Sequence, residues 1–529
     1  MREEYVVKEQ IRCVTNKTDG QKLSTSEVEQ GPREEESNII KVDGQQHNLH
    51  LRLRGRTSIS KIFFSSDILL HIVDQTNLYA LQEKPNKPLK LNVNELEQFI
   101  GTLLAMSMVK LSNSRLYWSN HFQCEMVTEA FSRNRWEQIK SNLHCNDNSQ
   151  APKYGDPNYD KLYKIRPLIN HLQSKFRKIP MPQMLCVDEQ LVPFKGKSSL
   201  KHYIPIKPHK WGYKIMALCG SDGVLYDFHV CDGPLKPVEG EPDLGASSNI
   251  VLQLAQTIPV GLNHLLYHDN WFTSLPLVTN LAKKQIYCLG TVRQVRLPGV
   301  PFHTDKELMK KGRGTHEEVS TLVDGVEVRA VKWLDNKCVN LLSTFSSALP
   351  LEECKRFDKK KKEITMIPCP AIVKVYNKFM GGVDLMDSLI ALYRIHTRSK
   401  KYYHKLISHF IDVSIVNAWL LYRRDSKAIG LIEKNIMMLQ EFKMLVAKAL
   451  LRQGPSKTAN KRGRPSTSID SMHAEKKRKG HATQVLPGSE RGRCKYPTCK
   501  GVTVIYCSKC KVNLCLTRNR NCYKEFHKK

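Results

Sequence analysis

Apolar residues recur at intervals of three and four over two parts of the chain, which predicts amphipathic helices that bury one face. The first part covers residues 55–180 and includes a clear helical run at 94–104. The second part covers residues 395–450, where long runs at 401–425 and 431–452 have the same spacing. We therefore predict an all-α layer that is assembled from two segments distant in the sequence.

The pattern between these two parts is typical of strands. Short apolar runs bounded by turn residues predict three strands, a helix and a fourth strand, at 184–187, 214–219, 225–230, 249–256 and 265–268. This order predicts an α/β sheet. An acidic residue directly follows the first strand and the fourth.

The remaining segments mark the boundaries between domains. A polar N-terminal segment predicts a disordered tail, and a basic, loop-rich segment is interpreted as an insertion into the α/β core. A basic linker then precedes a cysteine-rich C-terminus. The predicted parts are the tail (1–54), the helical layer (55–180 and 395–450), the core (181–292 and 371–394), the insertion (293–370), the linker (451–493) and the cysteine-rich module (494–529).

The charge balance narrows the class of partner. The 529 residues include 83 Lys or Arg against 51 Asp or Glu, which gives a net charge of +32. A surface this basic favours a polyanion, with nucleic acid as the first candidate and an anionic membrane surface as the second. The sequence has no run of eighteen apolar residues and its N-terminus lacks the apolar region of a secretory signal, so we expect neither membrane insertion nor secretion.

Four aspartates are candidates for a metal site. Asp188 and Asp269 follow predicted strands, Asp384 opens a predicted helix at 383–393, and Asp387 is one turn further along the same helical face. Converging carboxylates repel one another and favour divalent cations between them, and oxygen ligands suit Mg²⁺ or Mn²⁺. Two such ions can activate the attacking oxygen and stabilise the leaving oxygen of a phosphodiester. On spacing alone, aspartates at such positions more often serve as caps or turn residues.

Three sequence blocks around these aspartates resemble the catalytic blocks of piggyBac-type transposases. The first is VDEQL at 187–191, with YIPIKP at 203–208 behind it. The second is HDNWFTS at 268–274, and the third is MGGVDLMD at 380–387. The blocks have the order and the approximate spacing of the family, and the similarity covers roughly residues 55–450.

The resemblance implies a DDE/D transposase with an RNase H-like catalytic core. By position, Asp188, Asp269 and Asp384 would bind Mg²⁺ (or Mn²⁺), and Asp387 would be an auxiliary catalytic carboxylate. The family excises a DNA element by strand nicking, forms hairpinned ends and inserts them at TTAA sites. Excision of two ends implies at least a homodimer acting on double-stranded DNA. Domesticated members of the family can keep these aspartates for other reasons.

A lysine-rich segment follows the first aspartate. Residues 190–221 include no acidic residue, and their lysines alternate with aromatic residues, a pattern that favours DNA phosphates and exposed bases as ligands. Tyr213 is expected in the core, whereas Trp211 is equally compatible with the core and with a surface for stacking. The candidate DNA-binding lysines are Lys195, Lys197, Lys201, Lys207 and Lys210.

The linker contains a motif for DNA binding or nuclear import. Arg462 and Arg464 lie in KRGRP at 461–465, which has the Arg-Gly-Arg-Pro core of an AT-hook, whose arginines enter a narrow A·T minor groove. With the basic run at 476–479, the same residues match a bipartite signal for import into the nucleus. A solvated run of charges is the simpler alternative.

Six cysteines and a histidine near the C-terminus have metal-ligand spacing. Such a density predicts structural Zn²⁺, because so short a segment needs a metal to fold. The predicted ligands are Cys494, Cys499, Cys507, Cys510, Cys515, Cys522 and His527. In the cross-brace pattern that such tails resemble, Cys507, Cys510, Cys522 and His527 would form one site, and the other three cysteines would lack a fourth ligand.

Three functions are open at this point. The first is an active cut-and-paste transposase. The second is a domesticated protein that binds element ends or chromatin without cutting, and the third is a scaffold whose zinc module binds other proteins. The complete set of four aspartates favours the first function, whereas seven zinc ligands in place of eight, and the very basic tail, disfavour the third.

Overall fold

The structure, a computed structural model, describes residues 63–453 except 206, 236 and 359–361, and residues 483–485 and 491–527 except 518 and 519. The chain divides after residue 457 into two compact units, which we describe separately. None of the described helices combines the length and the apolar character that a bilayer crossing requires. The predicted tail, and Arg462 and Arg464 of the linker, lie outside the described residues.

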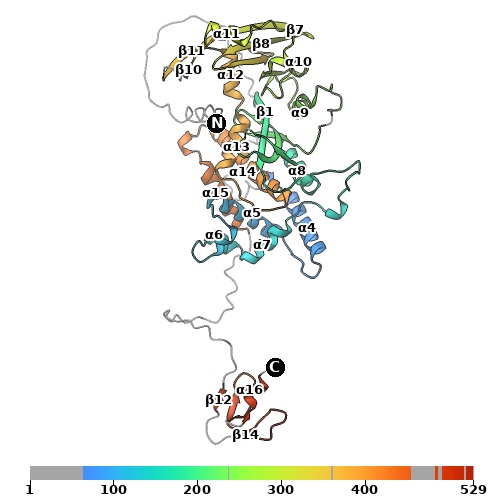
Figure 1. Cartoon of the computed structure of the whole chain (residues 1–529), viewed down its shortest axis with the longest axis vertical. Coiled ribbons are helices and arrows are strands. Elements are labelled where there is room, and N and C mark those ends of the chain that lie inside the picture. The colour runs from blue at the N-terminus through green and yellow to red at the C-terminus, as the bar shows by residue number, and fades with distance from the viewer. Residues whose placement is uncertain are drawn as a thin grey trace. The chain divides into compact units, whose positions relative to one another are not determined.

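Helices form one part of the larger unit (Figure 1). They are α4 (Ser66–Glu83), α5 (Val93–Met108), α6 (Glu125–Ala130), α7 (Arg133–Asn142), α8 (Arg166–Phe176), α14 (Tyr402–Ala428) and α15 (Leu439–Leu451). Ser132 caps α7, because its side chain accepts a hydrogen bond from the backbone N–H of Arg135. Helix α5 packs against α15, so the two helical segments of the sequence meet in one layer.

A mixed sheet forms the centre of the larger unit. Its strands β1 (Met184–Pro193), β3 (Trp211–Gly220) and β4 (Leu225–Val230) are antiparallel neighbours, with β2 (Lys201–Tyr203) at the edge of β3. On the other side of β1, β5 (His264–His268) and β6 (Ile286–Thr291) run parallel to it. Three antiparallel strands followed by parallel ones, with helices on the faces, confirm the predicted RNase H-like core.

Residues 293–370 are not loop-rich, and that expectation was wrong. They form α11 (Asp305–Lys311), β7 (His316–Val323), β8 (Val326–Leu334), β9 (Cys338–Ser343), β10 (Leu351–Asp358) and β11 (Glu363–Pro370). Strand β9 pairs with β6, so β7 to β9 extend the central sheet, while β10 and β11 form a separate hairpin. Most side chains of β7 and β10 are exposed or half-buried, which removes the apolar alternation that identifies a strand.

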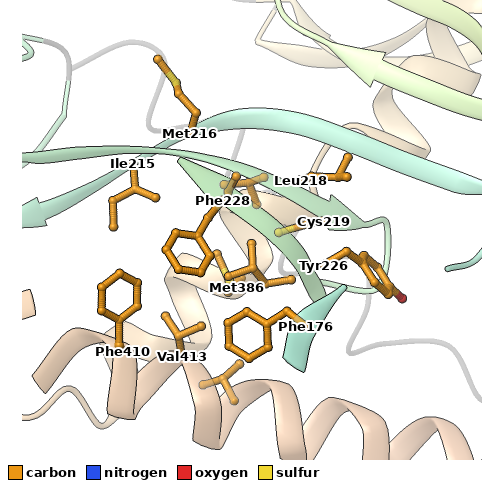
Figure 2. Packing of buried hydrophobic residues seen from close by; sticks show 14 of the residues in the cluster. Phe176, Ile215, Met216, Leu218, Cys219, Tyr226, Phe228, Met386, Phe410 and Val413 are labelled. Atoms are coloured by element: carbon orange, nitrogen blue, oxygen red, sulfur yellow. The ribbon is translucent and has the colours of Figure 1, made fainter. Parts of the chain in front are cut away.

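Aromatic side chains fill the space between the sheet and α14. The rings of Phe228 on β4 and Phe410 on α14 are 4.9 Å apart, and Phe176 on α8 lies 6.1 Å from Phe228. Figure 2 shows these rings with Met386 of α13 (Gly382–Leu392) in the same cluster. Shared packing of this kind fixes α13 against the sheet. The remaining helices of the core are α9 (Ala246–Ala255), α10 (Leu275–Lys283) and α12 (Ala371–Phe379).

The first residue of α13 lies unusually close to the sheet. A Cβ atom on Gly382 would overlap the carbonyl oxygen of Gly220 in β3 and lie 2.7 Å from the Sγ atom of Cys186 in β1. Only glycine permits this approach of a helix to two strands. The sequence pair Gly381-Gly382 therefore places the following turn of α13, which includes Asp384, directly beside β1.

The smaller unit is built around cysteines. Its strands are β12 (Thr483–Val485), β13 (Gly492–Arg493), β14 (Val502–Thr503), β15 (Ile505–Cys507), β16 (Val512–Asn513), β17 (Leu516–Thr517) and β18 (Arg520–Asn521), followed by α16 (Cys522–Phe526). Four of the five buried residues at its centre are cysteines, and the fifth is Leu514. So small an apolar core does not stabilise a fold without additional links.

Candidate metal centre

The register of two parallel strands brings Asp188 and Asp269 together. Val187 of β1 lies opposite His268 of β5, and the next residue on each strand is an aspartate. Asp269 directly follows β5, as predicted. Asp188 does not end a strand, because β1 continues to Pro193 and pairs with β3 over its whole length.

A third carboxylate, from Glu189, joins these two. Oxygen atoms of Asp188, Glu189 and Asp269 lie within 4.8 Å of one another. The backbone N–H of Glu189 donates a hydrogen bond to Asp188 Oδ1 at 2.7 Å, which turns the carboxylate of Asp188 along the strand toward its neighbour. Glu189 was not among the predicted site residues, although it stands inside the VDEQL block.

Electrostatics in this carboxylate cluster favour a cation. Burial raises the pKa of Asp188 well above its usual value, and the negative charges of Glu189, Asp384 and Asp269 raise it further. Burial also raises the pKa of Glu189, against the opposing effect of Lys214 and Lys207. Three crowded carboxylates with only oxygen donors fit a hard divalent cation such as Mg²⁺ or Mn²⁺, which would relieve the repulsion.

Asp384 lies beside this cluster and not within it. Its side chain is 52% exposed, and its Oδ1 atom is 3.9 Å from the Nζ atom of Lys207. Burial lowers the pKa of Lys207, but Asp384, Asp188 and Glu189 have the larger combined effect, so the pKa of Lys207 is raised and the lysine stays charged. The structure thus brings together two of the three predicted metal ligands, Asp188 and Asp269, and places the third, Asp384, next to the ammonium group of Lys207.

Asp387 occupies a separate, half-buried position on α13. Its Oδ1 atom accepts a hydrogen bond from Gln190 Nε2 at 2.7 Å, and Gln190 Oε1 lies 2.8 Å from His409 Nε2 on α14. Burial raises the pKa of Asp387 to about 6. Burial also lowers the pKa of His409 well below its usual value, so this imidazole is neutral and donates through Nε2.

The lysine-rich segment forms a surface beside the site. Lys195, Lys197 and Lys210 are exposed, while Lys201 extends its Nζ atom to 4.5 Å from the ring centre of Trp211. Trp211 is 48% exposed and lies with its ring 4.8 Å from that of Tyr203, which is 51% exposed. Trp211 is therefore a surface residue, and Tyr213, two positions further on, is buried as predicted.

One complete set of zinc ligands is present in the smaller unit. Cys494, Cys499, Cys515 and Cys522 place their sulfur atoms within 4.8 Å of one another. Backbone N–H groups of Gly501 and Cys515 donate to the sulfurs of Cys499 and Cys494, both at 3.4 Å. Four thiolates at this separation fit a tetrahedral Zn²⁺ ion.

The predicted pairing of Cys522 with Cys507, Cys510 and His527 was wrong. In the hairpin of β17 and β18, Leu516 lies opposite Asn521, so Cys515 and Cys522 flank the hairpin side by side. Cys507, Cys510 and His527 form a second group, with both sulfurs 3.3–3.4 Å from His527 Nε2. His527 Nδ1 donates to the carbonyl of Tyr523 at 2.7 Å, which leaves Nε2 as the ligand atom.

An RNase H-like sheet with carboxylates on neighbouring strands is the core architecture of DDE/D transposases. The profile of the family described as Transposase IS4 matches residues 58–419. The chain belongs to the piggyBac transposase family.

Relatives with curated descriptions support this membership. PiggyBac transposable element-derived protein 3 of Homo sapiens is 30% identical over 484 residues, which cover 90% of this chain and 76% of the relative. PiggyBac transposable element-derived protein 2 of Homo sapiens is 32% identical over 371 residues, 69% of this chain and 60% of the relative.

A solved structure has the same fold. The cryo-EM structure of a piggyBac transposase synaptic complex with hairpin DNA matches with a TM-score of 0.61. Sequence identity is 22%, and the match covers 86% of this chain and 96% of that one. At this identity, the likeness concerns the fold.

Proposed function

We propose that the chain is a DNA-cleaving transposase, which acts as a homodimer in the nucleus and excises and inserts DNA elements at TTAA sites. The observation that carries this proposal is the cluster of Asp188, Glu189 and Asp269, formed by the register of β1 and β5. Membership in the piggyBac family supports the reaction class. The synaptic complex of the structural relative contains hairpin DNA, which supports a duplex substrate here.

The carboxylates have distinct roles in this proposal. Asp188, Glu189 and Asp269 would hold Mg²⁺ or Mn²⁺, with Asp384 available beside them. Bound divalent cations supply activation of the attacking oxygen and stabilisation of the leaving oxygen in phosphodiester chemistry. Lys207, charged and next to Asp384, would position a phosphate of the substrate. Asp387 would keep α13 in register with β1 through Gln190.

DNA binding is assigned to three regions. Lys195, Lys197, Lys201 and Lys210 would hold phosphates near the cleavage site, and Trp211 with Tyr203 would stack on an exposed base. The zinc module would add recognition of the element ends. Arg462 and Arg464 in the linker would enter an A·T minor groove or serve nuclear import.

One observation favours a second function. Both human relatives described above are named as proteins derived from a transposable element. A chain of this kind could bind element ends or chromatin and leave the DNA intact. The two functions differ in whether the carboxylate cluster is needed for any effect on DNA.

Nicking of a supercoiled plasmid that contains TTAA sites separates these functions. We expect the full-length chain with Mg²⁺ to nick the plasmid. Asp269→Asn should reduce the rate at least a hundredfold and leave the affinity for DNA within twofold. Asp74→Asn, a change to an exposed aspartate of α4, is the matched control and should keep the parental rate. Equal nicking by both variants would refute the catalytic assignment, and DNA binding without nicking by the parent would favour the second function.

A further inference from the structure

An open cavity of about 500 Å³ lies in the helical layer. None of its lining residues belongs to the carboxylate cluster or to the lysine-rich segment. The floor is apolar and includes Phe99, Leu103 and Trp136 from α5 and α7. Its walls include the basic residues Lys110, Lys140, Arg398 and Lys405. A cavity of this volume with an apolar floor is typical of a site for a small molecule.

The basic residues of this cavity lack counter-charges. Among the described residues that line it, none is acidic. Lys140, Arg398 and Lys405 form no ion pair within the described part of the chain. Two acidic residues near the cavity are engaged elsewhere, since Glu137 pairs with Arg115 at 3.1 Å and Asp412 pairs with Lys443 at 2.8 Å.

Burial makes the missing counter-charge costly. Desolvation lowers the pKa of Lys405, and the nearby Arg394 lowers it further, against a smaller opposing effect of Asp412. Desolvation also lowers the pKa of Lys140, whose Nζ atom lies 5.1 Å from the ring centre of Trp136. Half-buried cations without an anionic partner favour binding of an anion, because the anion replaces the interactions with water that burial has removed.

We propose that this cavity binds a nucleotide, with the phosphate held by Lys140, Arg398 and Lys405 and the base packed on the apolar floor. Phosphate oxygens accept charge-assisted hydrogen bonds from ammonium and guanidinium groups, and a flat base fits against the apolar lining, which includes the half-buried Met106 and Leu111. A free mononucleotide and the terminal nucleotide of a DNA strand share this chemistry. The site is distinct from the metal centre and does not depend on catalysis.

The position of the cavity connects it to the candidate active site. Residues 395–398 of its wall lie between α13, which includes Asp384 and Asp387, and α14. The backbone N–H of Ile395 donates to Asp412 Oδ2 at 2.8 Å, and Lys110 Nζ donates to the carbonyl of Leu392, the last residue of α13, at 3.0 Å. An occupant would therefore restrain the segment that follows the helix of Asp384. An effect of the occupant on DNA cleavage rests on the proposed transposase function, whereas binding of the nucleotide to the cavity does not.

Binding of ATP to the full-length chain in buffer without added Mg²⁺ or Mn²⁺ tests the proposal, because the metal centre then lacks its divalent cations while the zinc module keeps its ions. We expect the double variant Arg398→Gln/Lys405→Gln to weaken ATP binding at least tenfold. The matched control, Lys84→Gln/Lys87→Gln, changes two exposed lysines outside the cavity and should bind within twofold of the parent. If the double variant fails to fold, Arg398→Gln alone, at an exposed position, should weaken binding at least threefold.

Competing oligonucleotides distinguish the two sources of the nucleotide. A 5′-phosphorylated hexanucleotide that displaces ATP at least tenfold better than its 5′-hydroxyl form identifies a DNA end, and failure of both forms to displace ATP identifies a free nucleotide. Failure of the parent to bind ATP or either oligonucleotide, or equal binding by parent and Arg398→Gln, would overturn the proposal. Asp269→Asn should bind ATP as the parent does, so a failure of the proposed catalytic function is separable from a failure of this site.

Discussion

Gln190 Nε2 donates a hydrogen bond of 2.7 Å to Asp387 Oδ1, and this contact joins the strand of the carboxylate cluster to α13, the helix of the third block that resembles the piggyBac family. Gln190 stands one residue after Glu189 on β1 and also contacts His409 of α14 through its other side-chain atom. Because Gln190 and His409 are buried and Asp387 is half-buried, each hydrogen bond is expensive to lose. The position of α13, and with it that of Asp384, depends on this connection.

The first prediction concerns the pH dependence of stability. The folded pKa of Asp387 is about 6, above its ordinary value of 3.8, so stability falls as the pH rises through this interval and the buried group becomes charged. Asp387→Asn removes that charge and keeps an oxygen that accepts from Gln190. We expect the variant to be more stable than the parent by roughly 2–3 kcal/mol at pH 8, with the difference vanishing near pH 4.

Urea denaturation in EDTA, followed by the fluorescence of the six tryptophans, measures this difference, since all six lie before residue 420. Asp74→Asn at an exposed position provides the control and should show no such trend. A stabilisation by Asp387→Asn that is the same at pH 4.5 and pH 8 would contradict the assigned pKa.

The second prediction concerns the glycine pair before α13. Gly382→Ala should destabilise the larger unit by about 1–3 kcal/mol and reduce cleavage, because the new methyl group would overlap Gly220 of β3 and displace α13. Gly381→Ala is the matched control, since a Cβ atom at that position meets no atom within 4 Å. Urea denaturation and plasmid nicking are the measurements. Similar losses in both variants would show that close approach is not the reason for Gly382.

The third prediction concerns the zinc ligands. Cys494→Ser and Cys522→Ser remove ligands of the same group, so each should cause the loss of one zinc ion, and the double variant should lose no more than either single variant. Native mass spectrometry of the full-length chain measures the zinc content. Cys507→Ser combined with Cys522→Ser affects both groups and serves as the comparison. If Cys494→Ser and Cys522→Ser have additive effects, the two cysteines do not share an ion.

The fourth prediction concerns the aromatic pair beside the lysines. Trp211→Ala should weaken binding of DNA with an unpaired base by about tenfold, because stacking on an aromatic side chain contributes roughly 1–3 kcal/mol per base. Tyr154→Ala is the control, since Tyr154 is 90% exposed and paired with another aromatic residue. Fluorescence anisotropy with duplexes that have or lack a flipped base provides the measurement. Equal affinity of Trp211→Ala and parent for both duplexes would exclude stacking.

The resemblance of the sequence blocks to the piggyBac family, and not the spacing of the aspartates alone, predicted that Asp188 and Asp269 lie together. The predicted order of strands and helix places the first and the last strand side by side in an RNase H-like sheet, and each strand is followed or interrupted by an aspartate. Alternation of side chains along a strand did not predict Glu189, since neighbours are expected on opposite faces. The structure nevertheless places oxygen atoms of Asp188, Glu189 and Asp269 within 4.8 Å of one another.

Other parts of the fold depended on information that local patterns do not contain. Cys515 and Cys522 belong to the same group of zinc ligands because they flank a short hairpin whose strands have only two residues each. Strand β7 joins the sheet with polar residues on both faces, so no alternation marks it. Trp211 is exposed at the start of β3, where it lies opposite Tyr203 of the edge strand β2.

Mapping of DNA breaks tests the central claim, that the carboxylate cluster cleaves DNA, most directly. The full-length chain and its Asp269→Ala variant would be incubated with Mg²⁺ and fragmented genomic DNA of the source organism, and every new 3′ end sequenced. We predict breaks that cluster beside TTAA and disappear in the variant, while both proteins bind the same fragments. Breaks that persist in the variant, or sequence-selective binding without any breaks by the parent, would contradict the account.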